Sequence, residues 1–223
     1  MQGEAEDSRH RLRRGWALGT TTGWFGGFLL GFVVASFFAW RLGHGPWQGV
    51  LGYFIGGTFL GATVGFAQWL VLRRRVSGTN PWVVASAAGM GLAGGASYGT
   101  AVLLFGYSEG LEDLASIPAL LGWTVAFALG GALTGGLQWR VLVGRVAHAG
   151  HWLWVSTVGW GLSIAAAGAV MVTGFQLAGG SYPGSLWLLG FLVAGGATLG
   201  VFTAVAAGRL STQVQADSPR VDA

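Results

Sequence analysis

The chain alternates between long runs that carry no charge and short polar segments. The charge-free runs extend over residues 16–40, 47–72, 82–106, 118–139, 152–178 and 186–207. At about 1.5 Å per helical residue the first run reaches about 37 Å, more than the roughly 30 Å of a hydrocarbon core. The runs do not alternate polar and apolar residues as the strands of a membrane barrel would. The pattern therefore predicts an all-α protein that crosses a membrane six times.

Polar segments enclose this predicted transmembrane domain of residues 16–209. Residues 1–15 form a polar N-terminal arm with four arginines, and residues 210–223 are expected to form a disordered tail. A basic start before an apolar run also resembles a signal peptide, whose apolar region is about 7–15 residues long. Because the first run is longer, we expect an uncleaved first helix.

The arginines give the predicted orientation. All twelve basic residues are arginines, and in a six-span topology all of them except Arg41 lie on one side of the membrane. Because loops rich in arginine stay in the cytoplasm, we expect both termini and the turns at 73–81 and 140–151 to be cytoplasmic. The loop with Glu109, Glu112 and Asp113 then lies outside. The predicted location is the plasma or inner membrane of a bacterial cell.

An internal repeat relates the middle of the chain to itself. A shift of 70 residues aligns 61–92 with 131–162, with 14 identities in 32 positions. A weaker third copy pairs Trp16 and Thr20 with Trp82 and Ser86, but Thr203 and Ala204 stand where the other copies have Gln-Trp. We expect three tandem, parallel hairpins at 16–72, 82–139 and 152–207, with approximate threefold pseudo-symmetry about the membrane normal.

The repeated motif is Gly-x-x-x-Gly-x-x-Gln-Trp-x-x-Leu, followed by arginine and a helix that begins with Trp. It occurs as Gly61, Gly65, Gln68, Trp69 and Leu72, and again as Gly131, Gly135, Gln138, Trp139 and Leu142. This motif resembles a group of uncharacterised bacterial multi-pass membrane proteins. The resemblance implies no activity, substrate or partner.

Glycines recur every four residues within several runs, close to the period of one helix face. Small residues at this spacing let helix backbones pack closely in membranes. The alternative is a narrow pore or a groove for a flat ligand. The glycines expected to pack helices are Gly19, Gly23, Gly27, Gly61, Gly65, Gly131 and Gly135.

Gln68 and Gln138 are the polar residues that stand out within the runs. An amide that faced lipid would be costly, so we expect both side chains to point inward. Glutamine can form hydrogen bonds between helices, each worth about 0.6 kcal/mol. The alternative is a ligand site or pore constriction at the cytoplasmic side, although the absence of a third glutamine weakens a symmetric ring.

Several tryptophans lie at the predicted cytoplasmic boundary of the runs. Interfacial tryptophan commonly forms an aromatic belt at the headgroup level, and stacking on a cofactor or pigment is the alternative. The expected belt residues are Trp16, Trp69, Trp82, Trp139 and Trp152.

Reactive chemistry is scarce in this sequence. Only 9% of residues are charged, there is no cysteine, and the six runs contain no Asp, Glu, Lys, Arg or His. Proton relays, ion coupling and voltage sensing usually depend on such residues. The four histidines, which lie outside the runs, have no metal-site spacing. We therefore predict no catalytic residue, metal site or cofactor.

The predicted function is a non-enzymatic scaffold or accessory subunit. Its expected partners are membrane lipids, another membrane protein or a second copy of the chain, and not nucleic acid. The alternative is a passive channel or facilitator for a small neutral solute, with Gln68 and Gln138 near its inner mouth.

Overall fold

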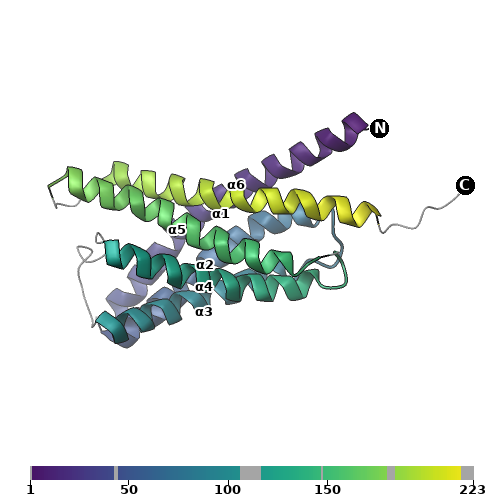
Figure 1. Ribbon diagram of the computed structural model, residues 1–223. Coiled ribbons are helices and arrows are strands. Elements are labelled where there is room, and N and C mark those ends of the chain that lie inside the picture. Colours follow the sequence, from purple (N-terminus) through teal and green to yellow (C-terminus); the bar gives the residue numbers. More distant parts are fainter. Residues whose placement is uncertain (1, 43–44, 106–116, 147, 180–183, 217–223) are drawn as a thin grey trace, which may run out of the picture.

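The computed structural model describes residues 2–42, 45–105, 117–146, 148–179 and 184–216. These residues form six helices and no strand (Figure 1). The helices are α1 (Gln2–Leu42), α2 (Pro46–Leu72), α3 (Trp82–Phe105), α4 (Ile117–Leu142), α5 (His151–Leu177) and α6 (Ser185–Ala216).

Five of these helices are long and apolar enough to cross a membrane. They contain the segments Glu6–Phe38, Pro46–Leu72, Ile117–Leu142, His151–Leu177 and Ser185–Arg209. The prediction of an all-helical protein is thereby confirmed, and five of its helices have the length and apolar composition that crossing a membrane requires. The helix α3, which is rich in glycine and alanine, is not one of the five, so a sixth crossing remains a prediction.

The two ends of the chain are more helical than the hydrophobic pattern indicates. Helix α1 begins at Gln2, within the polar arm, and α6 continues to Ala216. The predicted tail from residue 210 is therefore helical as far as Ala216, and residues 217–223 lie outside the described residues. Residues 209–216 contain neither glycine nor proline, so nothing in this segment interrupts the helix.

The helices form a closed ring. Each helix packs against the helices before and after it in the sequence, and α6 packs against α1. No other pair of described helices brings Cα atoms within 8 Å of each other. Side chains from the six helices therefore meet along the centre of the ring.

Two tight turns join α2 to α3 and α4 to α5, and they share backbone hydrogen bonds at equivalent positions. They differ at Gly144 (φ 75°), because its counterpart Arg74 does not have a positive φ. The amides of Val76 and Val146 donate to the carbonyls of Leu72 and Leu142 at 2.9 and 3.2 Å. A left-handed residue follows in each turn, Gly78 (φ 70°) and His148 (φ 55°). Both turns lie at the same end of the bundle as the start of α1 and the end of α6 (Figure 1).

Candidate functional site

Three tryptophans fill the centre of the ring at the end where the turns lie. Trp16 of α1, Trp82 of α3 and Trp152 of α5 are only 1%, 0% and 2% exposed. Their ring centroids are 6.2 Å apart for Trp16 and Trp82, 5.5 Å for Trp16 and Trp152, and 5.4 Å for Trp82 and Trp152. We call these residues the tryptophan triad.

The triad corrects the sequence-based prediction of an aromatic belt. Trp16, Trp82 and Trp152 face the interior of the bundle rather than the headgroups, because each indole packs on the other two and has a buried polar partner. Trp69 and Trp139 lie at the bundle surface, and Trp139 is 40% exposed. The guanidinium carbon of Arg73 lies 4.7 Å from the Trp69 ring centroid. For these two residues the belt remains a prediction.

Each indole of the triad donates a hydrogen bond to an even-numbered helix. The Nε1 of Trp82 donates to Gln68 Oε1 at 3.3 Å, and that of Trp152 donates to Gln138 Oε1 at 2.7 Å. The Nε1 of Trp16 donates to Thr203 Oγ1 at 3.0 Å. Thr203, which occupies the position of the absent third glutamine, therefore accepts the third indole hydrogen bond.

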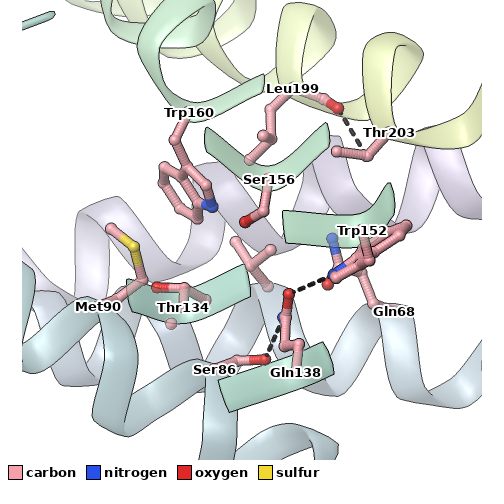
Figure 2. Close-up of a pocket in the computed structure, with 12 residues that line it drawn as sticks. Gln68, Ser86, Met90, Thr134, Gln138, Trp152, Ser156, Trp160, Leu199 and Thr203 are labelled. Carbon is pink, nitrogen blue, oxygen red and sulfur yellow. Dashed lines mark hydrogen bonds between the residues drawn. The ribbon is translucent and has the colours of Figure 1, made fainter. Parts of the chain in front are cut away.

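The nitrogen of each glutamine amide reaches a second helix. Gln68 Nε2 donates to Thr20 Oγ1 at 3.3 Å, and Gln138 Nε2 donates to Ser86 Oγ at 2.8 Å (Figure 2). Gln68 thus connects α2 to α1 and α3, while Gln138 connects α4 to α3 and α5. Both side chains are 4% exposed and point inward. Their amide groups are engaged in bonds that hold the ring together.

A small cavity of about 10 Å³ lies beside these amides (Figure 2). All of its lining residues are buried and uncharged. The polar ones come from five helices and are Gln68, Ser86, Thr134, Gln138, Trp152, Ser156, Trp160 and Thr203. The Thr134 hydroxyl, among the described residues, has no hydrogen-bond partner.

Aromatic side chains also fill the bundle further from the turns. Trp24 of α1 is fully buried, and its ring centroid lies 5.4 Å from that of Trp160 of α5. Phe28 stacks on Trp24, and Phe127 of α4 contacts Trp160. The cavity therefore lies between two aromatic layers.

The predicted packing glycines lie where helix backbones approach each other. A Cβ atom on Gly23 would lie 2.9 Å from the Thr63 carbonyl oxygen, and one on Gly131 would lie 2.6 Å from that of Ser156. Gly61 meets the Ser86 carbonyl in the same way. Equally close neighbours surround Gly27, Gly65 and Gly135, whereas a Cβ on Gly19 would lie 3.3 Å from the Ala67 carbonyl oxygen. These positions leave little or no room for a side chain.

An apolar groove of about 380 Å³ lies on the outer surface between α2 and α3. Its floor includes Gly95 and Ala96, whose small side chains leave space between larger neighbours. The remaining lining residues are Trp47, Val50, Leu51, Phe54 and Leu92. The position of this groove depends on how two helices pack, so the hydrophobic pattern alone does not predict it.

Some residues considered in the sequence cannot be placed here. The acidic loop with Glu109, Glu112 and Asp113, and also His44, lie outside the described residues. Among the residues that the structure does describe, no three His, Asp or Glu side chains are grouped as a metal site would need.

No protein-family model matches the chain, and neither a curated protein nor a solved structure matches it. The resemblance based on the repeated Gln-Trp motif therefore remains a prediction.

Proposed function

We propose that the chain is a non-enzymatic membrane scaffold or accessory subunit that binds lipid or another membrane protein through its outer surface. The observation that carries this proposal is the closed centre of the ring. The tryptophan triad and the two glutamines form hydrogen bonds there with one another and with Thr20, Ser86 and Thr203, in a space that a solute path would need. What remains available to a partner is the outer, apolar surface.

The proposal includes six crossings with both termini in the cytoplasm. Helix α3 has 24 residues and lies between two helices that are apolar enough to span, so it has the length to cross beside them. The turns at the end of α2 and α4 carry Arg73, Arg74, Arg75 and Arg145. Arginine-rich turns on one side of a bundle favour the cytoplasm.

The proposal also includes three hairpins in an approximately threefold arrangement. The support is the pattern of hydrogen bonds, since an indole of one hairpin donates to the second helix of the preceding hairpin in all three pairs. The backbone hydrogen bonds that the two turns share at equivalent positions add to this support. The third pair has threonine as acceptor, so it lacks the amide donor that each glutamine provides.

The groove between α2 and α3 is proposed to hold a lipid acyl chain. It lies on helices of membrane-spanning length, its lining is almost wholly apolar, and Trp47 at its edge is 81% exposed. The solvent around this surface is hydrocarbon and not water. Burial of a CH₂ group is worth about 0.8 kcal/mol when it leaves water, and that gain is absent when the group leaves lipid. In lipid, close van der Waals fit to the groove must provide the selectivity.

Native mass spectrometry of the protein extracted with its lipids tests this function. We expect stoichiometric lipid, or a stoichiometric protein partner, to remain bound. Replacing Ala96 with leucine fills the groove and should lower the retained lipid, whereas Val84→Leu on an exposed part of the same helix should not. Equal lipid retention in both variants would exclude the groove as the site of lipid binding.

Flux measurements separate the scaffold from the channel alternative. Liposomes that contain the protein should swell no faster in small neutral solutes than empty liposomes. If swelling is faster and Gln138→Leu changes its rate, the ring conducts and the scaffold proposal is wrong.

A further inference from the structure

The third hairpin lacks a group that the other two place at the centre of the ring. Gln68 and Gln138 each accept from an indole and donate to a hydroxyl of Thr20 or Ser86. Thr203 accepts from Trp16, but its hydroxyl donates to the Leu199 carbonyl of its own helix at 2.7 Å. Threonine has no amide that could reach the third hydroxyl.

That third hydroxyl belongs to Ser156, the counterpart of Ser86 in the repeat. Ser156 and Thr203 are 2% exposed, and both line the central cavity. Threonine is shorter than glutamine by a carboxamide group. The cavity therefore borders both Thr203, which lacks the amide, and Ser156, the hydroxyl that such an amide would reach.

The size and chemistry of the cavity select its occupant. A buried water needs about 10–15 Å³ of accessible space and two to four polar partners, and this cavity measures about 10 Å³. Its lining provides the hydroxyls of Ser156 and Thr134 together with the amide of Gln138. Thr134 is 1% exposed, and its buried hydroxyl has no partner among the described residues, which a water would provide.

We propose that one water molecule is bound in this cavity and takes the place of the third glutamine amide. Ser156 and Thr134 are its hydrogen-bonding partners, with Gln138 beside them. A metal cation is a poor alternative because no lining residue carries a charge, and an uncompensated buried charge is far more costly than a buried water. This inference uses the hairpin equivalence proposed above but does not depend on the scaffold function.

The substitution Thr203→Gln tests the proposal directly, with Thr203→Ser as its matched control. Glutamine should restore the third amide and expel the water, while serine keeps the hydroxyl that accepts from Trp16 and leaves the cavity open. Water-edited solid-state NMR of the full chain in liposomes measures the transfer of proton magnetisation from bound water to the Gln138 amide. We expect transfer in the natural chain and in Thr203→Ser, and its loss in Thr203→Gln.

Two NMR results would overturn the proposal, and so would one crystallographic or microscopy result. One is the absence of transfer in the natural chain. The other is unchanged transfer in a Thr203→Gln protein whose Trp16 indole signal shows that it is folded. A high-resolution map with five or more oxygen ligands at about 2.4 Å, as expected for a metal cation, would also overturn it.

A second variant keeps the test decisive if Thr203→Gln does not fold. Thr134→Val removes one proposed partner and nearly preserves the side-chain shape. Loss of one hydrogen bond should lower the affinity of the cavity for water about threefold and shorten the residence time of the water. If the exchange rate of the bound water in the Thr134→Val protein equals that in the natural chain, Thr134 is not a partner and the proposed site is wrong.

Discussion

Gln68 and Gln138 occupy equivalent positions in the repeat but differ in the quality of their hydrogen bonds. The bonds of Gln138 measure 2.7 and 2.8 Å, whereas both bonds of Gln68 measure 3.3 Å. Amide hydrogen bonds are commonest at about 2.9–3.0 Å and weaken as the distance grows. Gln138 therefore contributes more to the stability of the ring than Gln68 does.

We predict that Gln138→Leu is more destabilising than Gln68→Leu. Both changes leave a buried indole N–H without its acceptor, at a cost of about 1–2 kcal/mol. Because Gln138→Leu also removes the shorter bonds, it should cost about 0.5 kcal/mol more than Gln68→Leu. Thermal unfolding in a mild detergent, followed by tryptophan fluorescence, measures the difference. Gln176→Leu, on an exposed position of α5, is the control. Equal losses for Gln68 and Gln138 would contradict the distance argument.

At this scale the sequence predicts which residues are polar within the membrane but not every direction in which side chains point. The inward orientation of Gln68 and Gln138 follows from the cost of exposing an amide to lipid. No such cost fixes Trp82 or Trp152, because an indole near a helix end is stable both at the headgroups and in a core. The packing of three helices, which brings the indoles together, is what places them in the core and not at the headgroups.

Among the helix pairs, α2 and α3 show most clearly how glycine controls the spacing. Gly61 lies against the Ser86 backbone, and Gly57 and Gly94 lie against the backbones of Met90 and Tyr53. The contact thus runs along both helices and is made largely by main-chain atoms. Backbone atoms cannot rotate away, so a side chain at these glycines would separate the helices.

We predict that Gly61→Leu prevents normal assembly of the ring. The leucine Cβ would overlap the Ser86 carbonyl, and overpacking of this kind costs about 1–3 kcal/mol or more. Size-exclusion chromatography in detergent should show loss of the monodisperse peak. The matched control is Gly122→Leu in α4, where a Cβ meets no atom within 4 Å and the profile should not change. A monodisperse Gly61→Leu protein would show that close packing is not required there.

Element boundaries are the part of the fold that the sequence predicts best. Helices α2, α3 and α5 begin and end within one residue of the charge-free runs, because arginine, proline and glycine lie directly outside them. Helices α1, α4 and α6 run further than their apolar segments. Hydropathy marks where lipid contact ends, whereas a helix continues until its backbone is interrupted.

The orientation of the whole molecule can be tested with single cysteines, because the chain has none of its own. Ser77 and Val143, in the two turns, and Ser185, at the start of α6, are exposed. We predict that a membrane-impermeant maleimide labels Ser185→Cys in intact cells. Ser77→Cys and Val143→Cys should be labelled only after permeabilisation, because their arginine-rich turns are expected in the cytoplasm. Labelling of the two turns from opposite sides would exclude the proposed topology.

Closure of the ring is the feature that the repeat alone does not determine, since three hairpins in a row could also form an open layer. In the structure α6 returns to α1, and the ring centroids of Phe28 and Phe191 lie 5.1 Å apart. This contact joins residues at opposite ends of the sequence. A covalent link between the two positions therefore reports closure directly.

We predict that a short bifunctional thiol reagent links Phe28→Cys to Phe191→Cys within one chain in the membrane. The linked protein should migrate faster than the unlinked monomer in denaturing gels, because a large loop is closed. The control pairs Phe28→Cys with Leu121→Cys on α4, a helix whose Cα atoms do not come within 8 Å of those of α1, and should give no such band. If the 28–191 pair produces only dimers, α1 and α6 meet between chains, and the closed ring with its central cavity would then have to be built from two copies.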